Sequence, residues 1–413
     1  MIKNRKDEKL KVAYFLYLFI VFVGGATFLT ESDILIAATF CFSLFLFVRA
    51  KCQFNPQIVI ILLVFAAINL FSLVVLGNEV SLMAYVGYNL RILTAYFSIK
   101  YFGWDFFRYY LKAIYMIAWI SIPFYLIQLL DLNFFIKHFS FLNMSGELRS
   151  SVNYWNGLIY TAHQGTYLGI PRNPGFTIEP GVFGYLLGFA IILELIQNDF
   201  RLNKHIKLEI CVGLTTFSTT FYIVLGLLFF LVCFNKKRYY EMLLLFPFVV
   251  VLGYMLAQSE IVAGKVEKTI SATEIQENVG FDNFDEGAIL NRYGMLKVGV
   301  ENITRFPLGH GLNTAGLMKT LSGYVLAGPN TLMWMLIQWG IIFIFFMPWA
   351  LNRFFKLISP RLNLISRLLL IVIFAIWLFS CSIQTRDFLF FTILIFAVIP
   401  YRSFKGKVVK RNI

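Results

Sequence analysis

The chain alternates between long apolar runs and short polar connections. A helix that crosses a bilayer needs about 20 mainly apolar residues, and several runs approach or exceed that length. The runs cover residues 12–29, 34–48, 58–76, 80–102, 112–130, 181–197, 208–234, 241–258, 329–350, 366–384 and 388–401. This pattern predicts an all-α polytopic membrane protein that forms a single integral membrane domain over residues 1–413.

The charges between the runs predict how the chain is threaded. Lysine and arginine gather in short clusters, and such clusters favour the cytoplasmic side of a membrane. The basic segment before residue 12 is expected inside, followed by an uncleaved first span, and the basic segment after residue 401 is also expected inside. Residues 131–180 and 259–328 then form two long extracytoplasmic loops. We therefore expect both termini in the cytoplasm and the protein in the cytoplasmic (inner) membrane.

The run 208–234 does not fit this threading as one span, because a single span would place the basic residues 236–238 outside. Its middle is rich in hydroxyl side chains, from Thr215 to Thr220. Such side chains can satisfy backbone groups that a helix break exposes. We predict a hairpin of two short helices that bends near Ser218 and returns to the cytoplasm. The chain would then have about twelve membrane segments.

Composition supports the membrane class and excludes others. Hydrophobic residues make up 59% of the 413 residues and charged residues only 14%, which is too little charge for a soluble surface of this size. The net charge of +14 would suit nucleic acid, but the basic residues follow the membrane pattern instead. The five cysteines show no metal-binding spacing and none lies in either long loop, so we expect no disulfide framework or zinc site.

Two charged residues in the first long loop are candidates for binding or catalysis. Arg172 and Glu179 lie in the stretch 171–181, which has three prolines and two glycines and opens the span that begins at 181. A charge beside apolar walls costs free energy unless it has a partner or a ligand. A salt bridge between Arg172 and Glu179 would explain both residues equally well, so both interpretations stay open.

The second long loop offers Arg292 and His310. Arg292 precedes a short stretch with helical spacing, and glycines on both sides of His310 suggest a tight turn that exposes an imidazole or backbone N–H groups. A solvated loop histidine is the commoner explanation. Asn330 opens the next span, where free N–H groups could meet a pyrophosphate.

Arg91 lies inside a span, where an ionisable residue is either functional or part of a structural pair. Acidic residues also gather in the second loop. We interpret them as solvated rather than as metal ligands, because their polar stretch has no apolar periodicity. They are Glu274, Glu277, Asp282, Asp285 and Glu286.

These segments, in this order, resemble the Wzy-type O-antigen and exopolysaccharide polymerases and the related O-antigen ligases, over roughly residues 80–350. Single motifs are weak, and their order within the predicted topology carries the resemblance. The shared elements are an Arg, Gly-Phe and Glu-Pro stretch opening a span, a Thr/Ser-rich helix break, a loop Arg followed by Pro-Leu-Gly-x-Gly, and an Asn ten residues before a Gly. They correspond to Arg172, Gly175, Phe176, Glu179, Pro180, Thr215 to Thr220, Arg292, Pro307, Leu308, Gly309, Gly311, Asn330 and Gly340.

The resemblance implies a GT-C-like or O-antigen ligase-like membrane fold and a glycosyltransferase that joins oligosaccharide repeat units carried on polyprenyl pyrophosphate. Arg172 and Arg292 would bind the pyrophosphate from one outward-opening cavity, with Arg91 and Asn330 as further candidates. Glu179 and His310 are the candidate general bases. Neither a metal nor a cofactor is implied. The implied partners are the lipid-linked oligosaccharides, membrane lipid, a chain-length regulator and a flippase, and not nucleic acid.

One departure bears on the choice within this group. The ligases usually carry a histidine directly before the asparagine, and Pro329 stands there. His310 is not at that position, so the missing base favours a polymerase over a ligase. A lipid-linked oligosaccharide flippase is the competing transporter class, although it would favour inverted repeats and none is visible.

Overall fold

The structure is a computed structural model, and it describes residues 2–24, 29, 32–77, 81–144, 154–163, 166–167, 169–241, 299–300, 303–304, 306–312, 331–380 and 388–399. The chain divides into two compact units, which we treat separately. The first comprises Met1–Ile58, Val86–Leu225 and Arg386–Ile413, and the second comprises Val59–Tyr85 and Gly226–Thr385.

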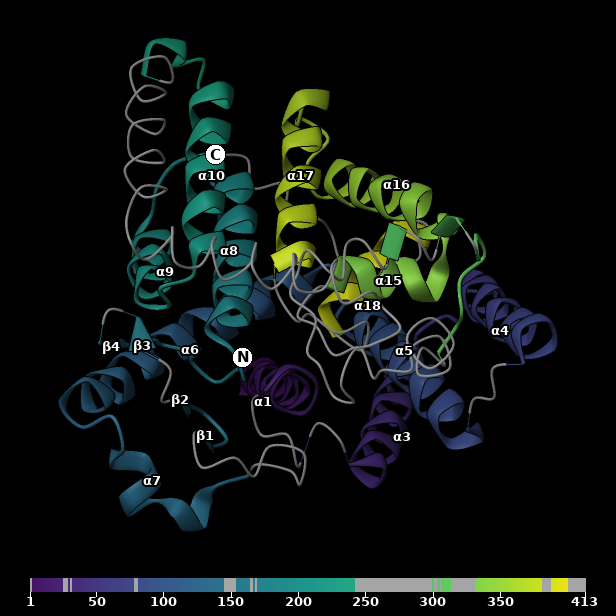
Figure 1. The fold of residues 1–413 in the computed structure, drawn as a ribbon, viewed down its shortest axis with the longest axis horizontal. Helices are drawn as coiled ribbons and strands as arrows, with labels where there is room; N and C mark the ends of the chain where they lie inside the picture. Colours follow the sequence, from purple (N-terminus) through teal and green to yellow (C-terminus); the bar gives the residue numbers. More distant parts are fainter. Residues whose placement is uncertain are drawn as a thin grey trace, which may run out of the picture. The chain divides into compact units, whose positions relative to one another are not determined.

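Helices make up most of the described residues of both units (Figure 1). The first unit contains α1 (Ile2–Val23), α3 (Asp33–Arg49), most of α5 (Leu82–Phe102), α6 (Asp105–Leu130), α7 (Phe134–His138), α8 (Pro180–Gln197), α9 (Lys204–Thr215), the start of α10 (Thr219–Asn235) and α18 (Phe388–Val398). The second contains most of α4 (Gln57–Leu76), the rest of α10, α15 (Thr331–Trp339), α16 (Ile341–Ile358) and α17 (Leu364–Ser380).

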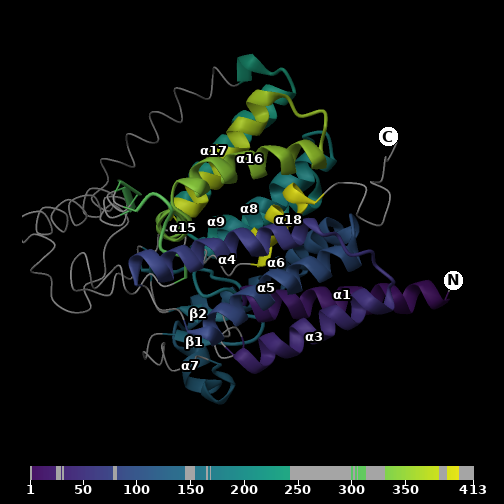
Figure 2. The same ribbon diagram turned by 90° about the vertical axis from the view of Figure 1, so that its right-hand side faces the viewer.

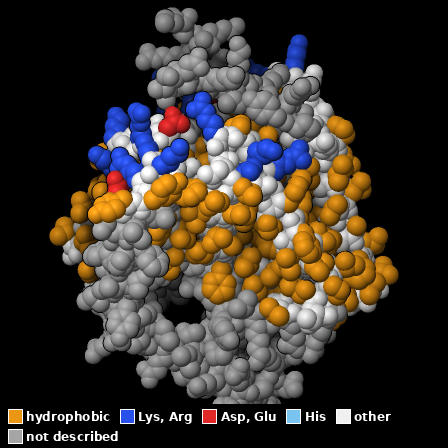
Figure 3. Space-filling model, turned by 90° about the horizontal axis from the view of Figure 1, so that it is seen from above, with side chains coloured by type: hydrophobic (Ala, Val, Ile, Leu, Met, Phe, Trp, Pro, Cys, Tyr) orange, Lys and Arg blue, Asp and Glu red, His pale blue; other side chains and the backbone are white. Residues whose placement is uncertain are grey.

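The helices have the length and composition of a membrane protein. Four helices of the described chain, α4, α6, α8 and α16, are long and apolar enough to cross a bilayer, and α10, α17 and α18 are shorter apolar helices. Large hydrophobic side chains stay exposed, and Figure 3 shows them over much of one face, with lysine and arginine gathered beside them. Exposed apolar surface of this extent suits lipid rather than water. The count of about twelve segments stays a prediction, and nearly all of the run 241–258 lies outside the described residues.

Aromatic and hydroxyl side chains hold the core of the first unit together. The Tyr14 hydroxyl of α1 lies 2.6 Å from Ser43 Oγ of α3 and 2.8 Å from Ser98 Oγ of α5, which ties these three helices (Figure 2). Phe15 packs edge-on against Phe102 and Phe106. The apolar runs thus bury their aromatic faces against one another, while their few hydroxyl groups pair in the interior.

Helix α8 lies at the centre of this unit and packs against α6 and α9. Its peptide groups contribute to the packing, because Tyr110 Oη donates a 2.8 Å hydrogen bond to Leu186 O. At the far end of α8, the buried Glu194 accepts from Asn203 Nδ2 at 2.6 Å and lies 3.1 Å from His205 Nδ1. These contacts join α8 to the first turn of α9 and form a tight connection.

The first long loop is partly folded, and it contains strands that the all-α prediction missed. Two antiparallel hairpins pair β1 (Tyr154–Asn156) with β2 (Thr161–His163) and β3 (Thr166–Tyr167) with β4 (Ile170–Pro171). Aromatic and β-branched residues in these segments favour strands over helix. Strands of two or three residues are too short to show the alternation of apolar and polar residues by which a strand is predicted from sequence.

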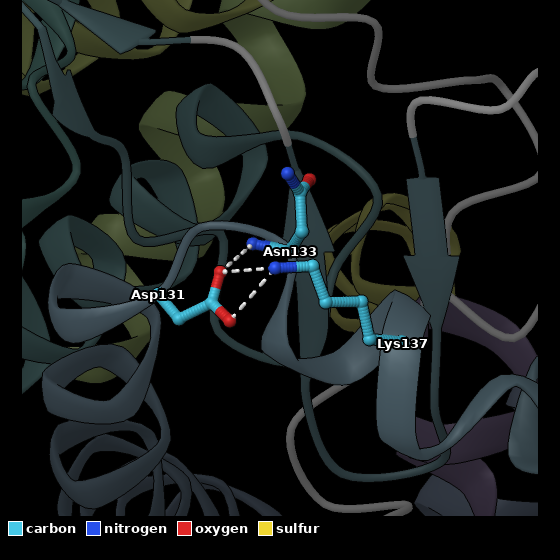
Figure 4. A network of polar contacts seen from close by, with 3 residues as sticks. All are labelled: Asp131, Asn133 and Lys137. Atoms are coloured by element: carbon cyan, nitrogen blue, oxygen red, sulfur yellow. Dashed lines mark hydrogen bonds and ion pairs between the residues drawn. The ribbon is translucent and has the colours of Figure 1, made fainter.

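The same loop begins with a compact turn at the end of α6. Asp131 Oδ1 accepts from Asn133 N at 2.9 Å, and Lys137 Nζ lies 3.1 Å from Asp131 Oδ2 (Figure 4). The Asn133 N–H and then the Lys137 ammonium hold the pKa of the Asp131 carboxyl below its usual range. The turn therefore fixes where the loop leaves the helix.

In the second unit, the predicted span 329–350 is not one helix. It is interrupted at Gly340, which has a φ of 59° and separates α15 from α16. The helical part also continues to Ile358. Glycine adopts this left-handed conformation at little cost, so a single residue is sufficient to break the run.

The predicted bend of the run 208–234 corresponds to a real helix break. Helix α9 ends at Thr215, α10 begins at Thr219, and Phe217 between them has a φ of 44°. The Phe221 ring fills the space beside Gly213, and Tyr222 Oη donates to Leu214 O at 2.9 Å. The first turn of α10 therefore folds back on the end of α9. The return of the hairpin to the cytoplasm stays a prediction.

Labelling of a cysteine at position 237 tests that return. In a cysteine-free background, we expect Lys237→Cys to react poorly with a membrane-impermeant maleimide on intact cells and well after permeabilisation. Ile170→Cys, in the predicted outer loop and 40% exposed, is the matched control and should react from outside. Strong external labelling at 237 would show that the segment crosses the membrane once.

Candidate functional site

The loop before α8 is fastened to the break between α9 and α10 by Asn173. Its backbone N–H donates to Thr215 O at 3.0 Å, and its Nδ2 donates to Thr215 Oγ1 at 2.9 Å. Its Oδ1 accepts from Gly175 N at 2.9 Å. The side chain is 1% exposed, so water does not compete for these bonds. One buried amide thus joins the predicted motif to the hydroxyl-rich break.

Arg172 attaches the same loop to Thr216, the residue that follows Thr215 in the break. Its Nε donates to Thr216 O at 3.1 Å, and the side chain is half-buried. A hydrogen bond at Nε fixes the plane of the guanidinium, whose geometry matches two oxygens of a phosphate. The cation is therefore oriented beside the helix break.

The break also begins a helix of 17 residues. Ser218 Oγ accepts from Phe221 N at 3.4 Å, the arrangement of an N-terminal cap, and Thr219 is exposed. The first turn of a helix carries the positive end of the helix dipole. Together with Arg172, this turn gives the break a positive character that suits an anion.

Glu179 lies at the other end of the same loop, as the N-cap residue of α8. Its carbonyl accepts from Val182 N at 3.1 Å and from Thr177 Oγ1 at 2.9 Å. These bonds fix the backbone of a candidate base seven residues after Arg172. The structure thus places Arg172 and Glu179 on one ordered loop.

Arg91 has a structural environment within the first unit. It lies in α5 with 8% of its surface exposed, and its guanidinium carbon is 5.9 Å from the centre of the Phe22 ring. A cation over an aromatic face is stabilised electrostatically, more strongly when water is excluded. This contact supports the structural interpretation of Arg91 and leaves a pyrophosphate-binding role as a prediction.

His310 differs from both expectations for it. The imidazole is neither exposed by the turn nor solvated, because only 2% of the residue is exposed and the ring packs edge-on against Phe306. Burial lowers the pKa of His310 to about 4. The imidazole is therefore neutral at physiological pH and a weak base, which makes a structural role more favourable than general-base catalysis.

The glycines around His310 bring two backbones together. His310 N donates to Ile337 O at 2.8 Å, Gly311 N donates to Gln338 O at 3.0 Å, and Ile341 N donates to Pro307 O at 2.8 Å. Gly309, with a φ of 79°, leaves no room for a side chain, since a Cβ there would lie 2.6 Å from Gln338 O. The segment 307–311, which we call the PLGHG turn, thus fills the break between α15 and α16.

Helix α4 holds the other side of the PLGHG turn. Ser72 Oγ donates to His310 O at 2.6 Å, and Asn69 Oδ1 accepts from Leu312 N at 2.9 Å. Neither Asn69 nor Ser72 is among the predicted site residues. They lie three positions apart in an otherwise apolar run, and on a helix that spacing places two polar side chains on one face, which indicates a shared partner.

Arg292, Asn330 and the acidic residues between 274 and 286 lie outside the described residues. The prediction that Arg172 and Arg292 face one cavity therefore stays a prediction. In the part of the chain that the structure describes, no group of three or more His, Cys, Asp or Glu side chains could hold a metal ion.

Comparison with known proteins adds no relative. No protein family, curated protein or solved structure matches the chain. The contacts around Arg172 and the order of the motifs are thus the basis for the function proposed below.

The buried imidazole predicts a pH dependence of stability. The pKa of His310 falls from 6.5 to about 4 on folding, so the unfolded chain binds more protons between these two values. The free energy of unfolding should therefore fall as the pH is lowered from about 6.5 to about 4, by up to roughly 3 kcal/mol from this residue.

The measurement compares wild type with His310→Asn by denaturant unfolding in detergent across that pH range. We expect the variant to be less stable at neutral pH and to lose less stability on acidification. Equal acid-dependent losses in the two proteins would mean that His310 can be protonated in the folded state.

Proposed function

We propose that the protein is a polysaccharide polymerase of the cytoplasmic membrane. It would join oligosaccharide repeat units carried on polyprenyl pyrophosphate, by en bloc glycosyl transfer at the outer face. The observation that carries the proposal is the orientation of Arg172 at the first turn of α10, beside helices of membrane type. A planar cation beside the positive end of a helix suits the pyrophosphate of a lipid carrier.

In this reaction negative charge develops on the leaving pyrophosphate, which a cation and a helix N-terminus would stabilise. The acceptor hydroxyl attacks the anomeric carbon of the donor chain, and the bond from that carbon to the pyrophosphate oxygen breaks. The leaving polyprenyl pyrophosphate gains negative charge, which Arg172 and the start of α10 would stabilise, together with Arg292 and Asn330. The acceptor proton passes to a base, for which Glu179 is the better candidate because the pKa of His310 is low.

The topology belongs to the same proposal. The chain would cross the membrane about twelve times, with both termini in the cytoplasm and the break at 216–218 toward the outer side. That threading places Arg172 where lipid-linked units arrive after transport. A flippase that supplies them and a chain-length regulator are the proposed partners.

Reconstitution tests the activity and its independence of metal together. Arginines can compensate the charge that a divalent cation would otherwise neutralise. We therefore expect purified protein in liposomes to elongate polyprenyl-pyrophosphate-linked repeat units into polymer in the presence of excess EDTA. The product is measured as a ladder of glycan lengths on the lipid carrier.

Other outcomes of this assay identify the alternatives. Transfer of preformed polymer to a separate acceptor, without elongation, would indicate a ligase. Movement of intact units across the bilayer would indicate a flippase. Elongation that stops with EDTA and returns with Mg²⁺ or Mn²⁺ would overturn the metal-independent mechanism and direct attention to residues 274–286.

A further inference from the structure

An apolar cavity of about 110 Å³ lies in the first unit, and every side chain that lines it is apolar. Its walls include Phe19 of α1, Ile117 of α6, Leu158 and Ile159 of the turn between β1 and β2, and Phe176 of the loop before α8. Phe19 and Phe176 stack with their ring centres 6.2 Å apart. A cavity of this lining does not suit water or sugar, and it selects hydrocarbon.

The turn between β1 and β2 reaches the middle of a membrane-type helix. The cavity touches α6 at Met116 to Ile120, which is 10 to 14 residues, or about 15–21 Å, before the helix ends at Leu130. Leu158 and Ile159 at the turn are 39% and 44% exposed. Both side chains also line the cavity, so the tip of this hairpin presents branched apolar groups to it.

Two backbone hydrogen bonds hold this turn in place. Gly157 N donates to Tyr160 O at 3.0 Å, and Thr161 N donates to Gly175 O at 2.7 Å. The second bond ties the hairpin to the loop that carries Arg172. The hairpin and that loop thus form one connected wall of the cavity.

The cavity and the oriented cation belong to the same short segment. Phe176 follows Arg172 by four residues, which limits the distance between their Cα atoms to about 14 Å. Asn173 holds the segment in place between them. A cation and a hydrocarbon site fixed at this spacing suit an amphiphile whose anionic group is joined directly to an apolar chain.

We propose that this cavity binds the isoprenoid segment next to the pyrophosphate of the lipid-linked donor, which rests on the function proposed above. An apolar cavity of about 150 Å³ accommodates benzene. The space here therefore suits one branched five-carbon unit rather than a length of straight acyl chain. Binding there would fix the carrier lipid by its first units while Arg172 holds the pyrophosphate.

Photolabelling tests this assignment. The probe is a polyprenyl pyrophosphate with a diazirine in the first isoprene unit, added to the full-length protein in nanodiscs. We expect labelled peptides to contain Met116 to Ile120 or Leu158 and Ile159. Unlabelled polyprenyl pyrophosphate should compete, and phosphatidylglycerol should not.

Matched variants show whether the label depends on the cavity. Ile159→Trp fills the space from the loop side and should lower labelling about tenfold. Met116→Phe does so from α6 and serves if the first variant does not fold. Leu126→Trp, on α6 and 53% exposed, is the control and should label as the wild type does.

The results separate this inference from the proposed function. Labelling elsewhere, or equal competition by phosphatidylglycerol, would overturn the cavity as an isoprenoid site even if the protein elongates glycans. Labelling of the cavity by a protein that never elongates glycans would support the site and count against the polymerase.

Discussion

Arg172→Lys is expected to lower the rate of polymerisation by about a hundredfold while the amount of protein in the membrane stays normal. Lysine keeps the charge but loses the planar fork and the Nε–H that bonds Thr216 O. A pyrophosphate leaving group would then meet a point charge without fixed orientation. Loss of one oriented donor to a developing anion commonly costs about this factor in rate. The measurement is the initial rate of glycan elongation in liposomes.

Arg201→Lys is the matched control for this prediction. Arg201 is exposed in the connection between α8 and α9, so its replacement should leave the rate unchanged. If Arg172→Lys polymerises at the wild-type rate, the positive charge at the break is sufficient for activity and the planar fork of arginine is not needed. If its activity falls in proportion to the amount of protein, Arg172 serves the stability of the loop.

Gly340→Ala is expected to destabilise the second unit by about 3 kcal/mol or more. A Cβ at Gly340 would collide with the carbonyl oxygen of Pro307, and the φ of 59° is unfavourable for alanine. The atoms that the added Cβ would meet all belong to the backbone, which cannot move aside as a flexible side chain can. The expected result is a large fall in thermal stability in detergent, measured by loss of the monodisperse peak after heating.

Alanine variants of two other glycines separate the steric collision of the Cβ from the backbone strain of a positive φ. Gly77 has a φ of 65° and nothing within 4 Å of an added Cβ, so Gly77→Ala should cost only about 1 kcal/mol from backbone strain. Gly226 has an ordinary helical conformation and open space, so Gly226→Ala should be neutral or stabilising by up to roughly 1 kcal/mol. If Gly340→Ala resembles Gly77→Ala, the packing against Pro307 is unimportant.

The positions of two helices could be predicted closely from the length of their apolar runs, whereas α1 begins at Ile2, ten residues before the run 12–29. The runs 58–76 and 181–197 begin within one residue of α4 and α8 and end where those helices end. The break near Ser218 was also predictable, since two basic flanks and a hydroxyl-rich centre both indicated it. In each case the pattern is local, so no knowledge of distant contacts was needed.

The break at Gly340 and the role of the PLGHG turn could not be predicted in the same way. A single glycine within an apolar run is compatible with a continuous helix, and only the approach of Pro307 requires the left-handed conformation. Likewise, glycines around a histidine fit either an anion-binding turn or close backbone packing. The burial of His310 by partners far away in sequence favours the second.

The hydrogen bond from Ser72 to the carbonyl of His310 joins residues 238 positions apart. During synthesis at about 5–20 residues per second, roughly 10–50 s pass between the emergence of these two residues from the ribosome. Helix α4 is therefore synthesised well before its partner exists, and Asn69 and Ser72 of the nascent chain cannot yet make these contacts. A nascent chain that stops short of the PLGHG turn would keep two polar groups on an apolar helix, and we expect membrane proteases to remove such truncated chains first.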